Sequence, residues 1–278
     1  MKKTLRKSRI ALTIMLFGWS IFVSASLAAE TVTVAGSTTV LPLAEATAEE
    51  FNAAHREIGV SVTGGGSGVG IKNIANGISD IGMASREVAS DEKSRYGDQF
   101  SESLVGYDCI VIAVSKQICD AGVTAMTKDQ IKKIYSGEIS NWNALGGPDS
   151  EIYVIAREQG SGTRDTFNED IMGDKKAETL GVDTVEMSSA GIKTAIIGSN
   201  KAIGYLGFSY VQQGNVGVII VEGVKPTIEN IKDGSYAMSR TLYFYTFGDA
   251  KPAAKEYINF VIGTEGQKII EENGFIPL

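Results

Sequence analysis

The sequence predicts an α/β fold with mostly parallel sheets. Short apolar runs that have the character of strands alternate with segments that have the periodicity of amphipathic helices. This alternation is typical of strands joined by crossover helices. About 43% of the 278 residues are hydrophobic, which is enough for one large domain or two smaller lobes.

The individual elements follow from these patterns in chain order. We expect strands at residues 31–35, 58–63, 80–84, 104–114, 152–156, 202–206, 216–221 and 241–247. We expect helices at residues 40–54, 127–135, 253–262 and 265–272, with shorter ones at 71–75 and after Gly162. Thr127 is a predicted N-cap, and Gln130 three residues later completes a capping box.

Residues 1–28 are predicted to be a signal peptide and are set aside from the fold. Five basic residues precede an apolar run at 10–23, whose fourteen residues fall short of the roughly 20 that span a bilayer. Ser26-Leu27-Ala28 fits the small-x-small rule, which predicts cleavage before Ala29. We therefore expect an exported, periplasmic protein. An uncleaved membrane anchor is the alternative.

The charge of the mature chain narrows its partners. The full sequence has 26 basic and 33 acidic side chains, and five basic but no acidic ones precede residue 29. The mature chain thus has 21 basic against 33 acidic side chains, a net charge of −12. Such a surface argues against nucleic acid or anionic lipid as partners. An anion site in this chain must depend on local donors.

Cysteine and histidine are too few to suggest a metal centre. Cys109 and Cys119 could form a disulfide in an exported protein, although Cys109 lies in an apolar run and could equally be a buried thiol. The one histidine, His55, is expected to be solvated. We expect no metal and no cofactor.

Three glycine- and hydroxyl-rich turns carry the strongest functional signal. They lie at residues 35–40, 64–70 and 157–164, and each follows a predicted strand and opens a predicted helix. Free N–H groups at a helix start form a ready anion site. Each turn alone could be an ordinary helix cap, but ligands gather at the carboxyl ends of strands in open α/β sheets. Together the turns indicate an anion site.

Competing motifs fail at specific positions. A nucleotide-binding loop would need lysine where Ile71 follows Gly70, and the dinucleotide pattern would need glycine at that same Ile71. The nucleophile elbow fails around both Ser67 and Ser161, and His55 is far from either serine in the sequence. We therefore expect a binding protein, not an enzyme.

Several of these segments also carry a family resemblance. The chain resembles the phosphate-binding component of the bacterial phosphate ABC importer, in its shorter form, from about residue 32 to 278. The matching segments are Ala-Gly-Ser-Thr-Thr-Val at 35–40, Gly-Ser-Gly-Val-Gly at 66–70, Asp-Ile-Gly-Met-Ala-Ser-Arg at 80–86, Tyr-Ser-Gly at 135–137 with Asn-Trp at 141–142, and Arg157 followed by Gly-Ser-Gly-Thr at 160–163. The last of these is the most diagnostic.

The resemblance implies a type II periplasmic-binding-protein-like fold with the ligand in a cleft between two lobes. It places lobe 1 at residues 30–112 plus 240–278 and lobe 2 at 113–239. The ligand-binding residues that it implies, with those that we add nearby, are Ser37, Thr38, Thr39, Ser67, Gly68, Ser85, Arg86, Asp108, Arg157, Ser161, Gly162 and Thr163. Arg157 would give paired planar donors to phosphate oxygens.

The chain departs from longer family members at two positions. They have an aspartate, which accepts the phosphate proton, where this chain has Ser85-Arg86. Asp108 is our first choice for that acceptor and Glu87 our second. Asp108 could instead bind hinge backbone or orient Arg86, and Arg86 could be a second ligand or form a surface salt bridge.

The other departure is Gln159, which stands where longer members have an acid two residues after the binding arginine. This leaves Glu158 as a weak candidate for the partner of Arg157.

The resemblance implies that the chain is a monomer that binds inorganic phosphate and delivers it to the membrane permease subunits of an ABC importer. A binding protein for sulfate or molybdate, a phosphate sensor and a secreted phosphate-ester hydrolase are the alternatives. The hydrolase would need a metal cluster or a nucleophile-base pair, which the sequence does not show.

Overall fold

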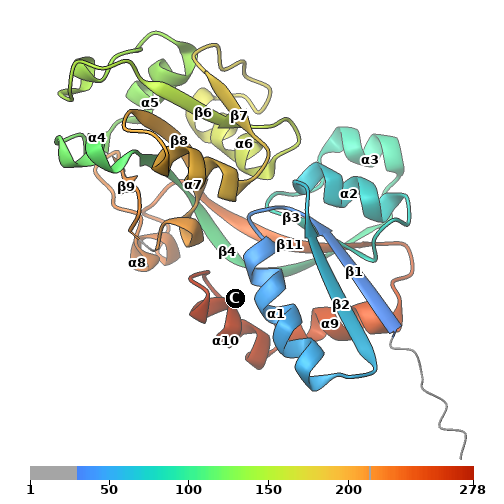
Figure 1. Cartoon of the computed structure of the whole chain (residues 1–278). Helices are drawn as coiled ribbons and strands as arrows, with labels where there is room; N and C mark the ends of the chain where they lie inside the picture. The colour runs from blue at the N-terminus through green and yellow to red at the C-terminus, as the bar shows by residue number, and fades with distance from the viewer. Residues whose placement is uncertain (1–29, 213) are drawn as a thin grey trace, which may run out of the picture.

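The computed structural model describes residues 30–212 and 214–278, and it forms two lobes joined by long strands (Figure 1). The predicted signal peptide and its cleavage point lie outside the described residues. The strands are β1 (Glu30–Gly36), β2 (Ile58–Gly64), β3 (Ile81–Ala84), β4 (Phe100–Val114), β5 (Ala125–Met126), β6 (Tyr153–Arg157), β7 (Thr184–Glu186), β8 (Ala202–Gly207), β9 (Gly217–Val218), β10 (Ile220–Val221) and β11 (Ser239–Phe247).

The α-helices pack around these strands in both lobes (Figure 1). They are α1 (Leu41–Ala54), α2 (Ser67–Ala75), α3 (Ser90–Tyr96), α4 (Lys116–Asp120), α5 (Lys128–Ser136), α6 (Gly162–Phe167), α7 (Ser189–Ile197), α8 (Ile228–Lys232), α9 (Pro252–Ile262) and α10 (Thr264–Glu272). Short 3-10 helices lie at Trp142–Leu145 and Phe208–Val211, and a short π-helix lies at Asn168–Met172. Among the described residues, none of the helices has both the length and the apolar character needed to span a bilayer.

One continuous sheet passes through both lobes in the order β2-β1-β3-β11-β4-β8-β6-β7, and β9 also pairs with β4. The pairs β1–β2, β1–β3, β6–β7 and β6–β8 are parallel, as the sequence predicts, whereas β11 pairs antiparallel with β3 and β4. The expected strand at 216–221 is wrong as a single element, because β9 pairs with β4 while β10 pairs with β5.

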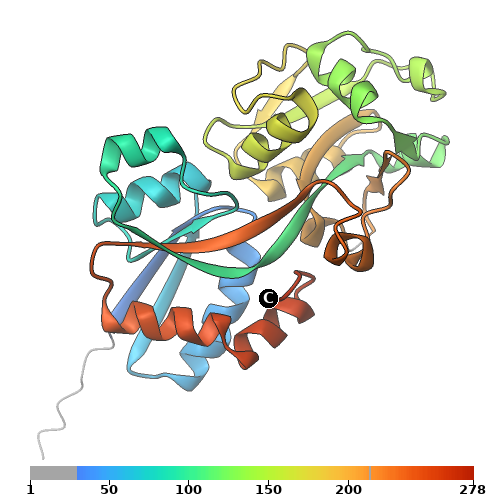
Figure 2. The ribbon, with the colours of Figure 1, turned by 180° about the vertical axis from the view of Figure 1, so that it is seen from behind.

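β4 is the strand that joins the two lobes. Its first part pairs with β11 as far as Cys109 opposite Ser239, and its last part pairs with β8 from Ile110 opposite Gly207. Seen from behind, β4 (green) and β11 (orange) run side by side between the lobes (Figure 2). The connection between the lobes is therefore built from β4, which changes its partner at this point, with β11 beside it.

Each lobe has its own hydrophobic core. One core joins β1, α1, β11 and α9 through residues such as Phe51, Phe244 and Tyr257. The other joins β4, β6, α6 and β8, and in it Phe167 stacks on Tyr205 with ring centroids 3.9 Å apart. Burying such apolar surfaces stabilises each lobe separately by about 25 cal/mol per Å².

Local signals in the sequence fix several of the helix ends. The capping box of α5 is confirmed: Gln130 N donates to Thr127 Oγ1 at 3.1 Å, and Thr127 N donates to Gln130 Oε1 at 2.9 Å. At the edge of the first lobe, Asp80 accepts hydrogen bonds from Thr33 N and Oγ1, both at 2.8 Å, and pairs with Lys251 Nζ at 2.7 Å. These contacts link β1, the residue before β3 and the start of α9.

Both cysteines are free thiols. Cys109 lies in the core on β4, where burial raises the pKa of its thiol well above the ordinary value. Of the two alternatives that the sequence left open, the structure has the buried thiol.

Candidate anion-binding site

The three glycine-hydroxyl turns converge between the lobes. The turns that open α1 and α2 belong to one lobe, and the turn that opens α6 belongs to the other (Figure 1). Thr39 Oγ1 and Thr163 Oγ1 lie 2.9 Å apart, and Gly68 N donates to Gly160 O at 3.0 Å. The turns follow the carboxyl ends of the parallel strands β1, β2 and β6, where open α/β sheets hold their ligands.

Arg157 is the charged centre of this cluster. It is the last residue of β6 and is 1% exposed. Glu158 holds its guanidinium with both carboxylate oxygens, at 2.8 Å from Nε and 2.9 Å from Nη2. The remaining contacts run from Nη1 to Ser189 Oγ and from Nη2 to Thr38 Oγ1, both at 3.1 Å. Glu158 is thus the partner of Arg157, and the guanidinium reaches residues of both lobes.

Ser67, Ser85 and Gly162 meet at the line of contact between the lobes. Ser85 N donates to Ser67 Oγ at 3.1 Å, and the two hydroxyls lie 3.5 Å apart. A Cβ atom on Gly162 would stand 2.6 Å from each of these two hydroxyl oxygens. Only a residue without a side chain allows this approach at the start of α6.

Ser37 and Ser161 have a more local role. Ser37 Oγ accepts hydrogen bonds from Thr39 N at 3.3 Å and Val40 N at 3.4 Å. Ser161 Oγ accepts from Arg164 N at 3.3 Å and caps α6. Both serines are buried in the turns, so their hydroxyls shape the backbone that surrounds the cluster.

Arg86 forms a largely buried ion-pair network at the edge of the cluster. Its Nη1 and Nη2 lie 2.7 and 2.9 Å from the two carboxylate oxygens of Glu92, and its Nε lies 2.8 Å from Asp165 Oδ2. Its side chain is 11% exposed. Arg86 thus forms the salt bridge that was one of our two alternatives, and its contact with Asp165 reaches from one lobe to the other. A role of Arg86 as a second ligand stays a prediction.

Asp108 lies on β4 and is 1% exposed. Its Oδ2 accepts from Arg240 Nη2 at 2.7 Å and Nε at 3.2 Å, while Oδ1 accepts from Phe208 N at 3.1 Å. Burial raises the pKa of Asp108 above its ordinary value, although Arg240 acts against this rise. These contacts match the hinge-backbone alternative and do not include Arg86. Glu87, our second choice for the proton acceptor, is exposed.

Sequence reasoning missed Ser189, the first residue of α7. It is fully buried and, besides its contact with Arg157, its N–H donates to Thr38 Oγ1 at 3.3 Å. The signal was a fourth hydroxyl-rich helix start, Ser188-Ser189 followed by Gly191. It was hard to see because the preceding strand, β7, has only three residues.

Arg240 was also missed. It is 7% exposed and donates to Thr163 Oγ1 at 2.8 Å and to Thr39 Oγ1 at 3.2 Å. The available signal was an arginine at the start of an otherwise apolar strand, where a charge needs a partner.

The charges in and around the cluster nearly cancel. Three arginines (Arg86, Arg157 and Arg240) pair with four carboxylates (Glu92, Asp165, Glu158 and Asp108). An anion here therefore finds local N–H and hydroxyl donors instead of a large positive field, as the acidic sequence requires.

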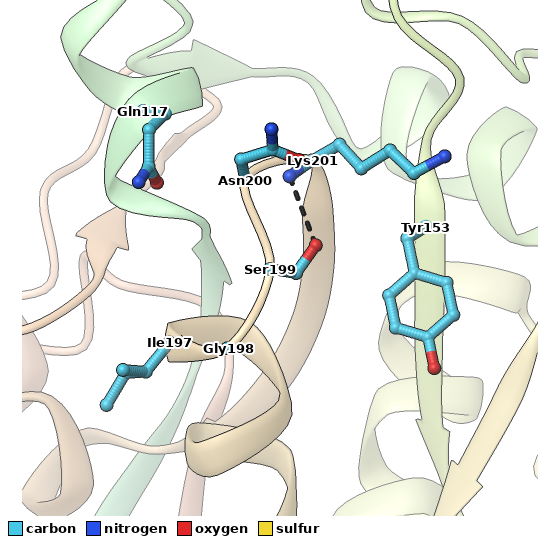
Figure 3. Close-up of a pocket in the computed structure, with 7 residues that line it drawn as sticks. All are labelled: Gln117, Tyr153, Ile197, Gly198, Ser199, Asn200 and Lys201. Carbon is cyan, nitrogen blue, oxygen red and sulfur yellow. Dashed lines mark hydrogen bonds between the residues drawn. The ribbon is translucent and has the colours of Figure 1, made fainter.

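A surface cavity on the second lobe lacks these features. It has a volume of about 560 Å³ and is lined by Gln117, Tyr153 and residues 197–201 (Figure 3). Tyr153 is the first residue of β6, so the cavity lies at the opposite end of this strand from Arg157. Its one cationic side chain is Lys201, whose backbone N–H donates to Ser199 Oγ at 3.1 Å.

His55 is likewise far from the cluster, at the end of α1. Its Nδ1 lies 3.2 Å from Glu256 and 3.6 Å from Glu57, and its ring stacks on Phe51.

Comparison with known proteins agrees with this geometry. The family model of the PBP superfamily domain matches residues 23–265. The phosphate-binding protein PstS of Bacillus subtilis is 34% identical over 254 residues, which cover 90% of this chain and 82% of the relative. The chain belongs to this family of phosphate-binding proteins.

Solved structures of family members have the same fold. A phosphate ABC transporter substrate-binding protein from Clostridium perfringens, solved with bound phosphate, has a TM-score of 0.82 and 37% identity, and the match covers 90% of this chain and all of that one. An ABC-type phosphate transport receptor from Vibrio cholerae has a TM-score of 0.71 and 31% identity, with 89% of this chain and all of that one covered. The two-lobed periplasmic-binding-protein fold expected from the sequence is thus confirmed.

Proposed function

We propose that this chain binds inorganic phosphate between its two lobes and delivers it to the membrane permease subunits of an ABC importer. The observation that carries the proposal is the convergence of Arg157 with hydroxyl groups from both lobes. Arg157 contacts Thr38 of one lobe and Ser189 of the other, and Thr39 meets Thr163 beside them. The family membership supports the same ligand.

The proposed site binds phosphate mainly with neutral donors around one oriented guanidinium. Glu158 fixes the plane of Arg157, so two parallel N–H groups can face a phosphate oxygen pair. The starts of α1, α2 and α7 add backbone N–H groups and the positive ends of their helix dipoles. Because these donors are buried between the lobes, each hydrogen bond is stronger than in water.

We keep the lobe limits of 30–112 plus 240–278 and 113–239 as part of the proposal. They are supported by the two separate cores and by the change of partner that β4 makes between Cys109 and Ile110. A site with donors in both lobes favours closure when phosphate binds. We further propose that the mature chain acts as a monomer in the periplasm, after removal of residues 1–28.

The hydrolase alternative is not favoured. The relatives are binding proteins by name, and the described residues of the cluster are serine, threonine, glycine, arginine and carboxylate side chains without a histidine or cysteine that could act as base or nucleophile.

Calorimetry of the refolded mature protein tests the proposal, because refolding removes phosphate retained from the cell. We expect tight binding of phosphate, competition by arsenate and much weaker binding of sulfate. A folded protein that gives no heat of binding with phosphate would refute the proposal. So would a phosphatase activity on phosphate monoesters that coelutes with the protein during repurification.

A further inference from the structure

Arg240 and Asp108 form a buried ion pair inside the hinge. They are register partners on β11 and β4, directly before β4 leaves β11 for β8. Their side chains are 3% and 1% exposed, and Arg240 Nη2 lies 2.7 Å from Asp108 Oδ2. A pair this deep is costly to desolvate, so its presence does not by itself indicate a stabilising role.

The guanidinium of Arg240 points from the hinge into the cluster of threonine hydroxyls. Nη1 donates to Thr163 Oγ1 at 2.8 Å, and Nη2 donates to Thr39 Oγ1 at 3.2 Å. Thr39 comes from the turn before α1, and Thr163 lies in α6 of the other lobe. These contacts and the two with Asp108 use four of the five N–H groups of Arg240.

We infer that Arg240 is a second anion-binding arginine, supplied by the hinge, and that Asp108 is the residue that orients it. The inference rests on the proposed function. Thr39 and Thr163 are both predicted phosphate ligands, and their hydroxyls now bond to each other 2.9 Å apart. When these hydroxyls turn to phosphate oxygens, Arg240 is left facing the same anion with its donors in place.

This assignment also explains how the hinge takes part in binding. Arg240 contacts Thr39 and Thr163 together only while the two lobes are closed on each other. Its position on β11 is fixed by Asp108, whose other oxygen holds the backbone N–H of Phe208. Phosphate bound to Arg240 thus stabilises the closed arrangement directly at the strands that bend.

The competing explanation is purely structural, with Arg240 serving only to neutralise Asp108. The two explanations differ in the two single variants. Arg240→Gln and Asp108→Asn break the same ion pair, so a structural role predicts equal changes in phosphate affinity. A binding role predicts unequal changes, with the larger loss in Arg240→Gln, because Asp108→Asn leaves the arginine in the site with an amide oxygen that can still accept from it.

The experiment is calorimetry with inorganic phosphate on refolded mature protein, with thermal unfolding measured on the same samples. We expect Arg240→Gln to weaken phosphate binding by about 10- to 100-fold, the worth of hydrogen bonds from a charged donor. Asp108→Asn should lower the unfolding temperature and weaken phosphate binding much less than Arg240→Gln, because the amide oxygen of asparagine can still accept from Arg240 and keep it in the site. The exposed Arg56 provides a matched control, and Arg56→Gln should change neither quantity.

Two further variants keep the test decisive if a single variant folds poorly. The double variant Arg240→Gln/Asp108→Asn removes both buried charges, so it should regain stability without regaining affinity. Arg240→Lys keeps the charge but loses the planar fork, and it should release phosphate faster with little change in association rate. Wild-type affinity in either variant, or equal losses in the two single variants, overturns the assignment of Arg240. A wild-type protein that ignores phosphate instead overturns the proposed function.

Discussion

Replacing Gly162 with alanine is expected to hold the two lobes apart without unfolding either of them. The new Cβ would stand 2.6 Å from Ser67 Oγ and from Ser85 Oγ, and 3.2 Å from Arg86 Cγ. Gly162 is not among the glycines with positive φ, so alanine fits its backbone conformation. The clash therefore arises only across the contact between the lobes.

The size of the effect follows from the missing space. Ordinary contacts of a Cβ begin at about 3.4 Å, so the serine hydroxyls must move by several tenths of an ångström or the lobes must separate. Overpacking of this kind costs about 1–3 kcal/mol. Because the cost applies to the closed form alone, phosphate affinity should fall by about 5- to 150-fold. Thermal stability of the ligand-free protein should stay within about 0.5 kcal/mol of the wild type.

Calorimetry and small-angle scattering with and without phosphate measure this effect. Gly68→Ala should lose less affinity, because its Cβ would meet Gly160 O at an ordinary 3.4 Å. Gly59→Ala is the control outside the site, since a Cβ there meets no atom within 4 Å. The reasoning is wrong if Gly162→Ala binds phosphate with wild-type affinity and its radius of gyration still falls on binding as in the wild type.

Three more predictions test separate contacts. Arg157→Gln should weaken phosphate binding by about 2–5 kcal/mol in calorimetry. It should also lower the stability of the fold, because it leaves the buried carboxylate of Glu158 unpaired. Adding Glu158→Gln should restore this stability but not the phosphate affinity. Asp165→Asn breaks only the interlobe contact of Arg86 and should weaken phosphate binding about fivefold at low salt, with the difference shrinking as salt rises; a salt-independent loss would speak against an ionic contact. Burial alone would raise the pKa of Asp80, but its hydrogen bonds lower it below the ordinary value of 3.8, so its stabilisation is present above that pH and lost as the pH falls through the folded-state pKa. Asp80→Asn should therefore cost about 1 kcal/mol in denaturant unfolding at pH 7, and this cost should shrink as the pH falls below 3.8 through the folded-state pKa; a cost that does not change on acidification would exclude a charge effect.

The fold class and the positions of the three turns could be predicted from local patterns in the amino-acid sequence. Apolar runs predict strands wherever they occur, and Thr127 with Gln130 predicts the start of α5, because such signals act between residues close in the chain. The motif that begins at Arg157 likewise indicated the candidate site and its ligand class through its resemblance to a known family. The limits of β4 were less predictable, since residues 101–103 are polar and join the strand only through pairing with β11.

The pairing of the charged side chains, in contrast, depends on how the packed elements bring distant residues together. Arg240 and Asp108 are 132 positions apart in the sequence, and Arg86 meets Asp165 across the two lobes. No local pattern selects such partners, because a buried charge is stabilised by whichever opposite charge the packed backbone brings within about 3 Å of it. The same limit hid Ser189, which lines the site only because α7 packs with its first residue against Arg157 and Thr38.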